Sequence, residues 1–121
     1  MARLVSHRLD DIEEQIAFLT TVRAQHDKQA FMESLVLRFS CQYAVLIIAE
    51  AVAKLPAALL ANYESLQWHR IKAIGNKLRH EYHRVKPLVI WDIMDKHLVP
   101  LAEGIQTLRR HVHSFETESD A

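Results

Sequence analysis

Turn-forming residues are scarce in this chain, which has only two glycines and three prolines among its 121 residues. Tight β-hairpins depend on Gly, Asn and Asp at their turns, so a fold built from hairpins is disfavoured. Half of the residues are hydrophobic and a quarter are charged, which is typical of a globular domain and not of a disordered chain. A chain of this length can bury one hydrophobic core. We therefore expect a single all-α domain.

Apolar residues recur at spacings of three and four, the pattern of helices that bury one face. The predicted elements cover residues 3–25, 27–54, 56–62, 65–85 and 87–115. Asp27 and Ser65 can cap the helices that follow them, and Pro100 should kink the last helix. The second helix is apolar nearly all round and should be central. Together these elements predict an up-and-down four-helix bundle with one short extra helix, formed by residues 1–115 and followed by a flexible tail over 116–121.

The cysteine content and the apolar runs favour a cytoplasmic protein. Cys41 is alone, so the sequence predicts neither a disulfide framework nor a cysteine-based metal site. Residues 44–53 form the most hydrophobic run, but Glu50 interrupts it and it is too short to cross a bilayer. No glycine-rich phosphate loop is present. We expect no cofactor, no bound metal and no membrane association.

Positive charge is concentrated in one segment of a chain whose formal net charge is zero. Residues 68–86 contain six Lys and Arg residues against Glu81 alone, which is a local charge of +5. A focused basic patch on a neutral protein indicates an anionic partner that binds at one place.

The same segment gathers polar side chains on one face of its predicted helix. At roughly 100° per residue, six side chains fall within a wedge of about 100°; they belong to His69, Lys72, Asn76, Arg79, His80 and His83. The wedge contains no carboxylate, although an exposed helix usually mixes Glu with Lys. A solvated polar face is one explanation. A zinc site made by His80, His83 and His69 is another, but Lys72 and Arg79 would repel the metal.

These residues carry a family resemblance. The run from Trp68 to Tyr82, followed by Val85, Trp91-Asp92 and the run Leu98-Val-Pro-Leu101, resembles the HEPN superfamily and, within it, the HepT-like toxins. The motif of that family reads Arg, Asn, three variable residues, His, one residue, Tyr. Asn76, His80 and Tyr82 match it, but Gly75 stands in place of the arginine. The resemblance in helix pattern extends from about Leu9 to Leu108.

The resemblance implies a dimeric, metal-independent ribonuclease that is the toxin of a toxin–antitoxin pair and is neutralised by a cognate nucleotidyltransferase antitoxin. His80 is then the candidate general acid or base, since imidazole changes charge near neutral pH. We assign the missing guanidinium to Arg79, which would bind phosphate oxygens in a bidentate manner, and Asn76 would orient His80 or a phosphate oxygen. The candidate RNA- and phosphate-binding residues are Lys72, Lys77, His83 and Arg84.

Tyr82 matches the tyrosine that the antitoxin adenylylates in the resembled toxins, so modification there is expected to switch the enzyme off. A half-buried packing role is the alternative for Tyr82. Because Gly75 departs from the motif, a catalytically inactive binding subunit of a nucleotidyltransferase stays open as a second function. A helical dimerisation module that binds nucleic acid without cutting it is the third.

Overall fold

The computed structural model describes the backbone of residues 4–120 and the side chains of residues 4–116. Its helices are α1 (Val5–Gln25), α2 (Lys28–Glu33), α3 (Leu35–Ala53), α4 (Ala57–Leu60), α5 (Trp68–His80), α6 (Pro87–Asp92), α7 (Leu98–Arg109) and α8 (Val112–Asp120). Two 3-10 turns, η1 (Ala61–Tyr63) and η2 (Tyr82–Arg84), and one π-helical segment, η3 (Ile93–His97), complete the fold. Residues 4–120 contain no strand. The all-α helical bundle expected from the sequence is confirmed.

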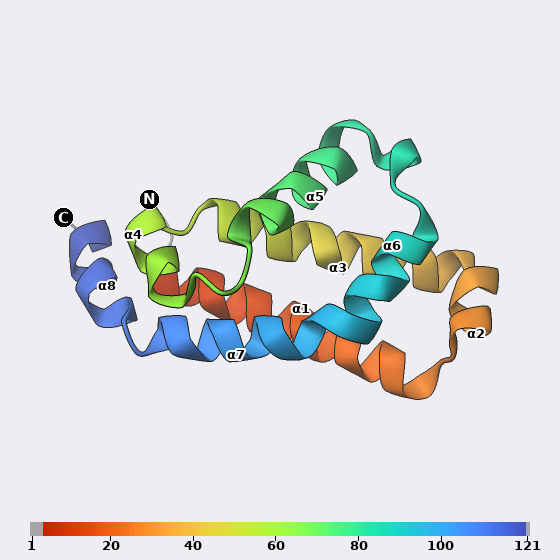
Figure 1. Cartoon of the computed structure of the whole chain (residues 1–121), viewed down its shortest axis with the longest axis horizontal. Helices are drawn as coiled ribbons and strands as arrows, with labels where there is room; N and C mark the ends of the chain where they lie inside the picture. Colours follow the sequence, from red (N-terminus) through yellow and green to blue (C-terminus); the bar gives the residue numbers. More distant parts are fainter. Residues whose placement is uncertain (1–3, 121) are drawn as a thin grey trace.

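The four long elements of the bundle are α1, α3, α5 and the run from α6 through η3 to α7, and α4 with η1 forms the short extra helix. Helix α1 packs against α3 and α7, and α3 also contacts α5 and α6 (Figure 1). The buried stripe of α1 includes Leu9, Ile12 and Leu19, none of which is exposed to solvent. Ile105 and Leu108 of α7 complete this side of the core. The stripe on α1 lies where the three- and four-residue spacing predicts it.

Helix α3 is the central helix, as its composition predicts. By length and composition it is the one helix of the described chain that could cross a membrane. It packs between α1 and α5, with Val45, Ile48 and Val52 buried in the core. Its N-terminal half has a second face that exposes Val36 and Phe39 to solvent. The helix therefore belongs to the core but leaves part of its apolar surface without a partner.

The predicted helix over 27–54 is divided in two. The Asp27 cap is confirmed, since its Oδ1 accepts a hydrogen bond from the backbone N–H of Ala30 at 2.8 Å. Seven residues later Ser34 leaves the helical conformation, and its Oγ accepts from the N–H of Leu37 at 3.1 Å. Ser34 thus ends α2 and caps α3. Serine has little preference for a helix interior and a strong one for this position.

The predicted helix over 65–85 is shorter at both ends. Ser65 does not cap it, because α5 begins at Trp68 after Gln67 and has no side-chain cap. The turn before α5 is instead held by the indole N–H of Trp68, which donates to the carbonyls of Leu60 and Tyr63 at 3.1 and 2.9 Å. At the other end the helix stops at His80.

The last predicted helix, 87–115, is interrupted twice. The first irregularity is η3, which precedes Pro100 by a few residues. Proline has no N–H and its ring crowds the carbonyl four residues earlier, and the wider turns of η3 lie at that point of the chain. The second break separates α7 from α8. Glu116, where we expect a tail to begin, lies in α8, and its carboxylate accepts hydrogen bonds from the backbone N–H groups of Val5 and Ser6. Residue 121 lies outside the described residues.

Candidate functional site

Helix α5 reaches its position through a very close approach to α3. A Cβ atom added to Gly75 would lie under 3.0 Å from the Cβ of Ala49, closer than real side chains come. Leu78, one turn further along α5, is buried on the same side. Position 75 therefore faces α3 and has no room for an arginine. The departure from the family motif at this position has a packing reason.

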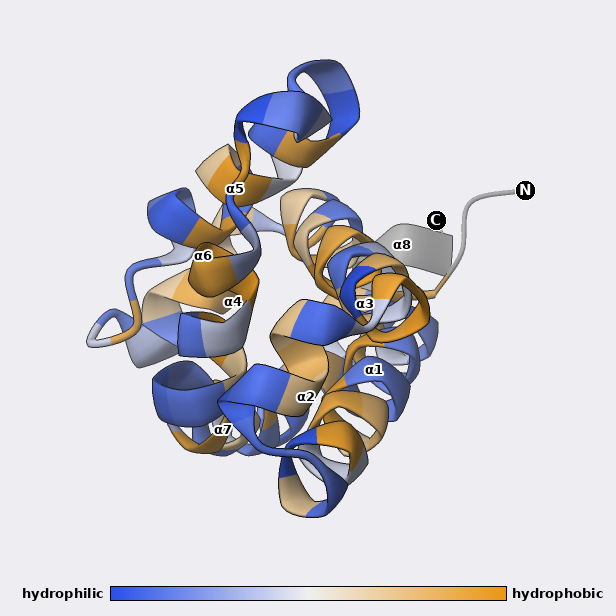
Figure 2. Ribbon diagram, turned by 90° about the vertical axis from the view of Figure 1, so that its right-hand side faces the viewer, coloured by the Kyte–Doolittle hydropathy of each residue, from blue (hydrophilic) through white to orange (hydrophobic). Residues whose placement is uncertain are grey.

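The polar wedge of α5 lies beside this buried face, with Arg79 one turn after Gly75 at its edge. Lys72, Asn76, Arg79 and His80 are all exposed, and the free end of α5 is hydrophilic (Figure 2). Side chains three and four positions apart on a helix have Cβ atoms roughly 5–6 Å apart. The structure thus brings Asn76, Arg79 and His80 together at the C-terminal end of α5. These are the three residues that the sequence analysis proposes as catalytic.

Arg79 has a partner that the sequence analysis did not identify. Its Nη1 lies 3.1 Å from Oε1 and 3.4 Å from Oε2 of Glu50 on α3. The guanidinium is about half exposed, so this is a partly solvated ion pair that still leaves other N–H donors available. Glu50 is the only charged residue within the apolar run 44–53, and that isolation was the signal that could have identified it.

The residues after His80 do not continue the wedge. Glu81 leaves the helical conformation, with φ −139° and ψ 42°, and the chain turns through η2. The expectation that His83 shares a continuous helical face with His80 is therefore wrong. His83 and Arg84 are exposed in η2, and Arg84 makes a 4.0 Å contact with Glu81. The basic residues still cluster at one end of the bundle, but they lie on two elements.

Tyr82 is exposed, not half-buried. Its relative exposure is 65%, and its ring meets the imidazole of His83 edge-on at a centroid distance of 5.9 Å. No hydrogen bond of its hydroxyl to another described residue is present. The packing interpretation of Tyr82 is wrong, because the side chain lies outside the core and the phenol oxygen is accessible to a modifying enzyme.

The described part of the chain offers no ready metal site. No three His, Cys, Asp or Glu side chains of that part lie close enough to hold an ion. His69 and His80 stand at opposite ends of α5, roughly 16 Å apart along the axis at 1.5 Å per residue. The zinc site considered from the sequence, which needs both of them, is not assembled.

Cys41 does not provide an alternative nucleophile. It is fully buried in α3, and burial raises the pKa of its thiol to about 11. The thiolate, which is the reactive form, is therefore scarce at neutral pH.

The comparison with protein families bears directly on α5 and its surroundings. The family model described as "Ribonuclease HepT-like" matches residues 12–108. The chain belongs to this HepT-like family. The match runs from α1 into the last turn of α7 and includes all of α5, with Asn76, Arg79 and His80. It supports ribonuclease activity at the level of the family. No curated protein and no solved structure matches this HepT-like chain.

Proposed function

We propose that this HepT-like chain is the toxin of a toxin–antitoxin pair, a metal-independent endoribonuclease that acts as a cytoplasmic dimer. One observation carries the proposal: the family match spans the helix on whose exposed end His80, Arg79 and Asn76 stand together. The surrounding cations, including Lys72, would hold the phosphate backbone of an RNA strand. Lys77, His83 and Arg84 are the other cationic or titratable side chains at this end of the bundle.

The proposed reaction uses the RNA as its own nucleophile. The ribose 2′-oxygen attacks the adjacent phosphorus, its O–P bond forms, and the bond from phosphorus to the 5′-oxygen breaks. A base takes the 2′-proton, and an acid returns a proton to the departing 5′-oxygen. An imidazole can fill either role near neutral pH, so two copies of His80 in a dimer would supply both. The products are a 2′,3′-cyclic phosphate and a 5′-hydroxyl.

Arg79 takes the place of the motif arginine in this scheme. Its guanidinium is adjacent to His80 in sequence and would stabilise the charge that develops on the phosphate oxygens. Glu50 holds one side of that guanidinium at 3.1 Å, which restricts where the remaining donors can point. Asn76 stands one turn before His80 and would orient the imidazole or a phosphate oxygen.

The exposed face of α3 provides a surface for dimerisation. Val36, Phe39 and Tyr43 follow one another at three- and four-residue spacing and are all exposed. Phe39 and Tyr43 line a small hollow together with Leu78 of α5, so this face adjoins the end of α5 that carries His80. A second copy seated there about a twofold axis would bring two His80 side chains toward one groove.

The proposed partner that silences the enzyme is a nucleotidyltransferase antitoxin. The exposed phenol of Tyr82 is two residues from His80, so an added AMP group would place anionic bulk at the mouth of the RNA site. Such a group would compete with the RNA phosphates for Arg79 and its neighbours.

A second function is favoured by a specific observation. Gly75 cannot be an arginine in this packing, so the chain lacks the motif guanidinium at its usual position. If Arg79 does not replace it, the chain is an inactive binding subunit of the nucleotidyltransferase. RNA cleavage distinguishes the two functions, because only the toxin would cut RNA.

The test is cleavage of RNA by the purified full chain in the presence of EDTA, together with growth after induction in cells. We expect wild-type protein to cut RNA and arrest growth, and His80→Ala and Arg79→Ala to do neither. A matched control is His69→Ala, because His69 lies on the same helix at the other end. Cleavage that EDTA abolishes would contradict metal independence. Wild-type protein that neither cuts nor arrests growth would leave the binding-subunit function.

A further inference from the structure

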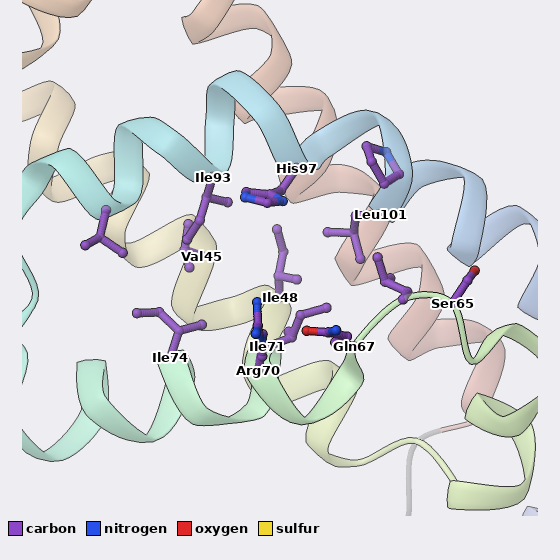
Figure 3. Close-up of a pocket in the computed structure, with 13 residues that line it drawn as sticks. Val45, Ile48, Ser65, Gln67, Arg70, Ile71, Ile74, Ile93, His97 and Leu101 are labelled. Atoms are coloured by element: carbon purple, nitrogen blue, oxygen red, sulfur yellow. The ribbon is translucent and has the colours of Figure 1, made fainter.

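An apolar groove separates α5 from the helices that follow it. Helix α5 packs on α3 but makes hardly any contact with α6 and α7. The space between them has a volume of about 520 Å³. Val45 and Ile48 of α3 form its floor, and Ile74 of α5 lies across it from Ile93 of η3 (Figure 3). The volume lies within the roughly 300–1,000 Å³ of typical small-molecule sites.

One end of this groove is apolar, whereas the middle and the other end mix polar side chains with Ile71 and Leu101 (Figure 3). Ile74 and Ile93 lie toward one end, whereas Arg70, Gln67 and Ser65 lie from the middle toward the other end (Figure 3). His97 projects from the wall opposite Arg70. This arrangement differs from a uniformly apolar groove made for one face of a partner helix. It matches a molecule with an apolar body and a polar head.

The charges at the polar end favour an anionic head. The groove lining includes no carboxylate, and within residues 4–116 the guanidinium of Arg70 has no ion pair or hydrogen bond. The two acids near His97 in sequence already have cationic partners. Asp95 pairs with Arg23 at 2.9 Å, whereas Asp92 pairs with Lys96 at 3.0 Å and lies 3.6 Å from the His97 Nε2. The hydrogen bond from Lys96 is the main reason that the pKa of Asp92 is lowered. The Asp92 carboxylate therefore stays ionised and bound to Lys96. Arg70 is left as the unpaired cation.

We propose that this groove binds a small amphipathic carboxylate. The apolar body lies over Val45 and Ile48 toward Ile74, and the carboxylate accepts hydrogen bonds from the guanidinium of Arg70, with His97 as a second donor. The site shares helix α5 with the proposed RNA site but none of its residues. It does not depend on the ribonuclease proposal.

The test follows isoleucine methyl signals by NMR while the full chain is titrated with sodium decanoate below its micelle concentration. Four isoleucines line the groove, namely Ile48, Ile71, Ile74 and Ile93. Ile12, Ile16 and Ile105 belong to the buried core but do not line the groove, and they serve as internal controls. We expect decanoate to shift the first set and not the second, and decanol to bind more weakly.

Variants test the head group and the groove separately. Arg70→Gln should weaken decanoate binding about tenfold and leave decanol binding unchanged, because a charge-assisted pair is lost. Arg110→Gln, an exposed arginine outside the groove, should change neither. Ile74→Trp should fill the groove and abolish the binding of both decanoate and decanol.

Four results would overturn the proposal. Equal binding of decanoate and decanol would show that the groove does not recognise an anionic head group. An Arg70→Gln variant that binds decanoate as tightly as the wild type would show the same. Absence of binding up to millimolar ligand would show that the groove is no ligand site. Shifts of the same four methyls on simple dilution, without ligand, would show that a second copy of the chain occupies the groove.

Discussion

Gly75 of α5 lies directly against Ala49 of α3, and there is no space between the two helices for a side chain on residue 75. The contact determines how near α5 comes to the central helix, and therefore that Arg79, one turn later, reaches Glu50. The same contact excludes the arginine that the family motif carries at this position. Gly75 thus affects both the packing of α5 on α3 and the position of Arg79 in the candidate site.

Adding a single methyl group at position 75 should destabilise the protein. Helix propensity alone favours Ala over Gly by up to about 1 kcal/mol. Against this, Gly75→Ala forces its Cβ onto Ala49, and overpacking of this kind costs roughly 1–3 kcal/mol. We expect a lower free energy of unfolding in urea, and recovery in the Gly75→Ala, Ala49→Gly double variant. Ala73→Gly, at an exposed position of α5, reports propensity alone. A more stable Gly75→Ala would contradict the observed packing.

Removing the charge of Glu50 should slow RNA cleavage but leave the stability of the fold almost unchanged. An exposed ion pair contributes under about 1 kcal/mol, so Glu50→Gln should unfold almost as the wild type does. If Glu50 orients Arg79 beside His80, the same variant should cut RNA about tenfold more slowly at saturating RNA. Glu14→Gln, an exposed acid on α1, is the matched control. Unchanged cleavage by Glu50→Gln would leave the ion pair without a role in the reaction.

The exposed face of α3 should control the oligomeric state. Phe39→Asp places a charge in the middle of this face, which would be desolvated in a dimer, so sedimentation should show a monomer. RNA cleavage should fall with it if both copies of His80 are needed. Val99→Asp changes a residue that is 70% exposed on α7 and should leave a dimer intact. Dimers of Phe39→Asp would show that the copies meet elsewhere.

Tyr82 should be the modified tyrosine. It is 65% exposed in the single chain and Tyr43 is 64% exposed, so exposure in the monomer does not distinguish the two phenols. Incubation with ATP and the cognate nucleotidyltransferase should add AMP to the wild type and to Tyr43→Phe, but not to Tyr82→Phe, as measured by intact-protein mass. An unmodified wild type, or a modified Tyr82→Phe, would contradict the proposed switch.

Glu116 should make stability depend on pH at the start of α1. Burial alone would raise the pKa of its carboxyl, but hydrogen bonds from Ser6 and Val5 outweigh this and lower it. A carboxyl with a lowered pKa stabilises the folded state above its ordinary value of 4.5, and this contribution is lost as the pH falls through the folded-state value. Glu116→Gln should therefore cost roughly 0.5–1 kcal/mol at neutral pH, in the range of an exposed helix cap, and little in acid. An equal cost at both pH values would show that the charge is not involved.

Much of the fold could be predicted because helices leave local signals. The buried stripe of α1 and the cap at Asp27 depend on residues within four positions of one another, which a sequence displays directly. The breaks at Ser34 and His80 were missed, since a continuous apolar pattern runs through both. Exposure of Asn76, Arg79 and His80 could be predicted in the same local way, whereas their chemical roles stay predictions.

The sequence by itself determined which elements are helical and which residues of α5 face outward, because periodicity and capping are short-range properties. Only the tertiary structure decided that Gly75 touches Ala49, that Glu50 pairs with Arg79, and that a groove opens beside Arg70. Each of these depends on the distance and angle between helices. Those quantities are set by side-chain packing across the whole core, and no local pattern encodes them.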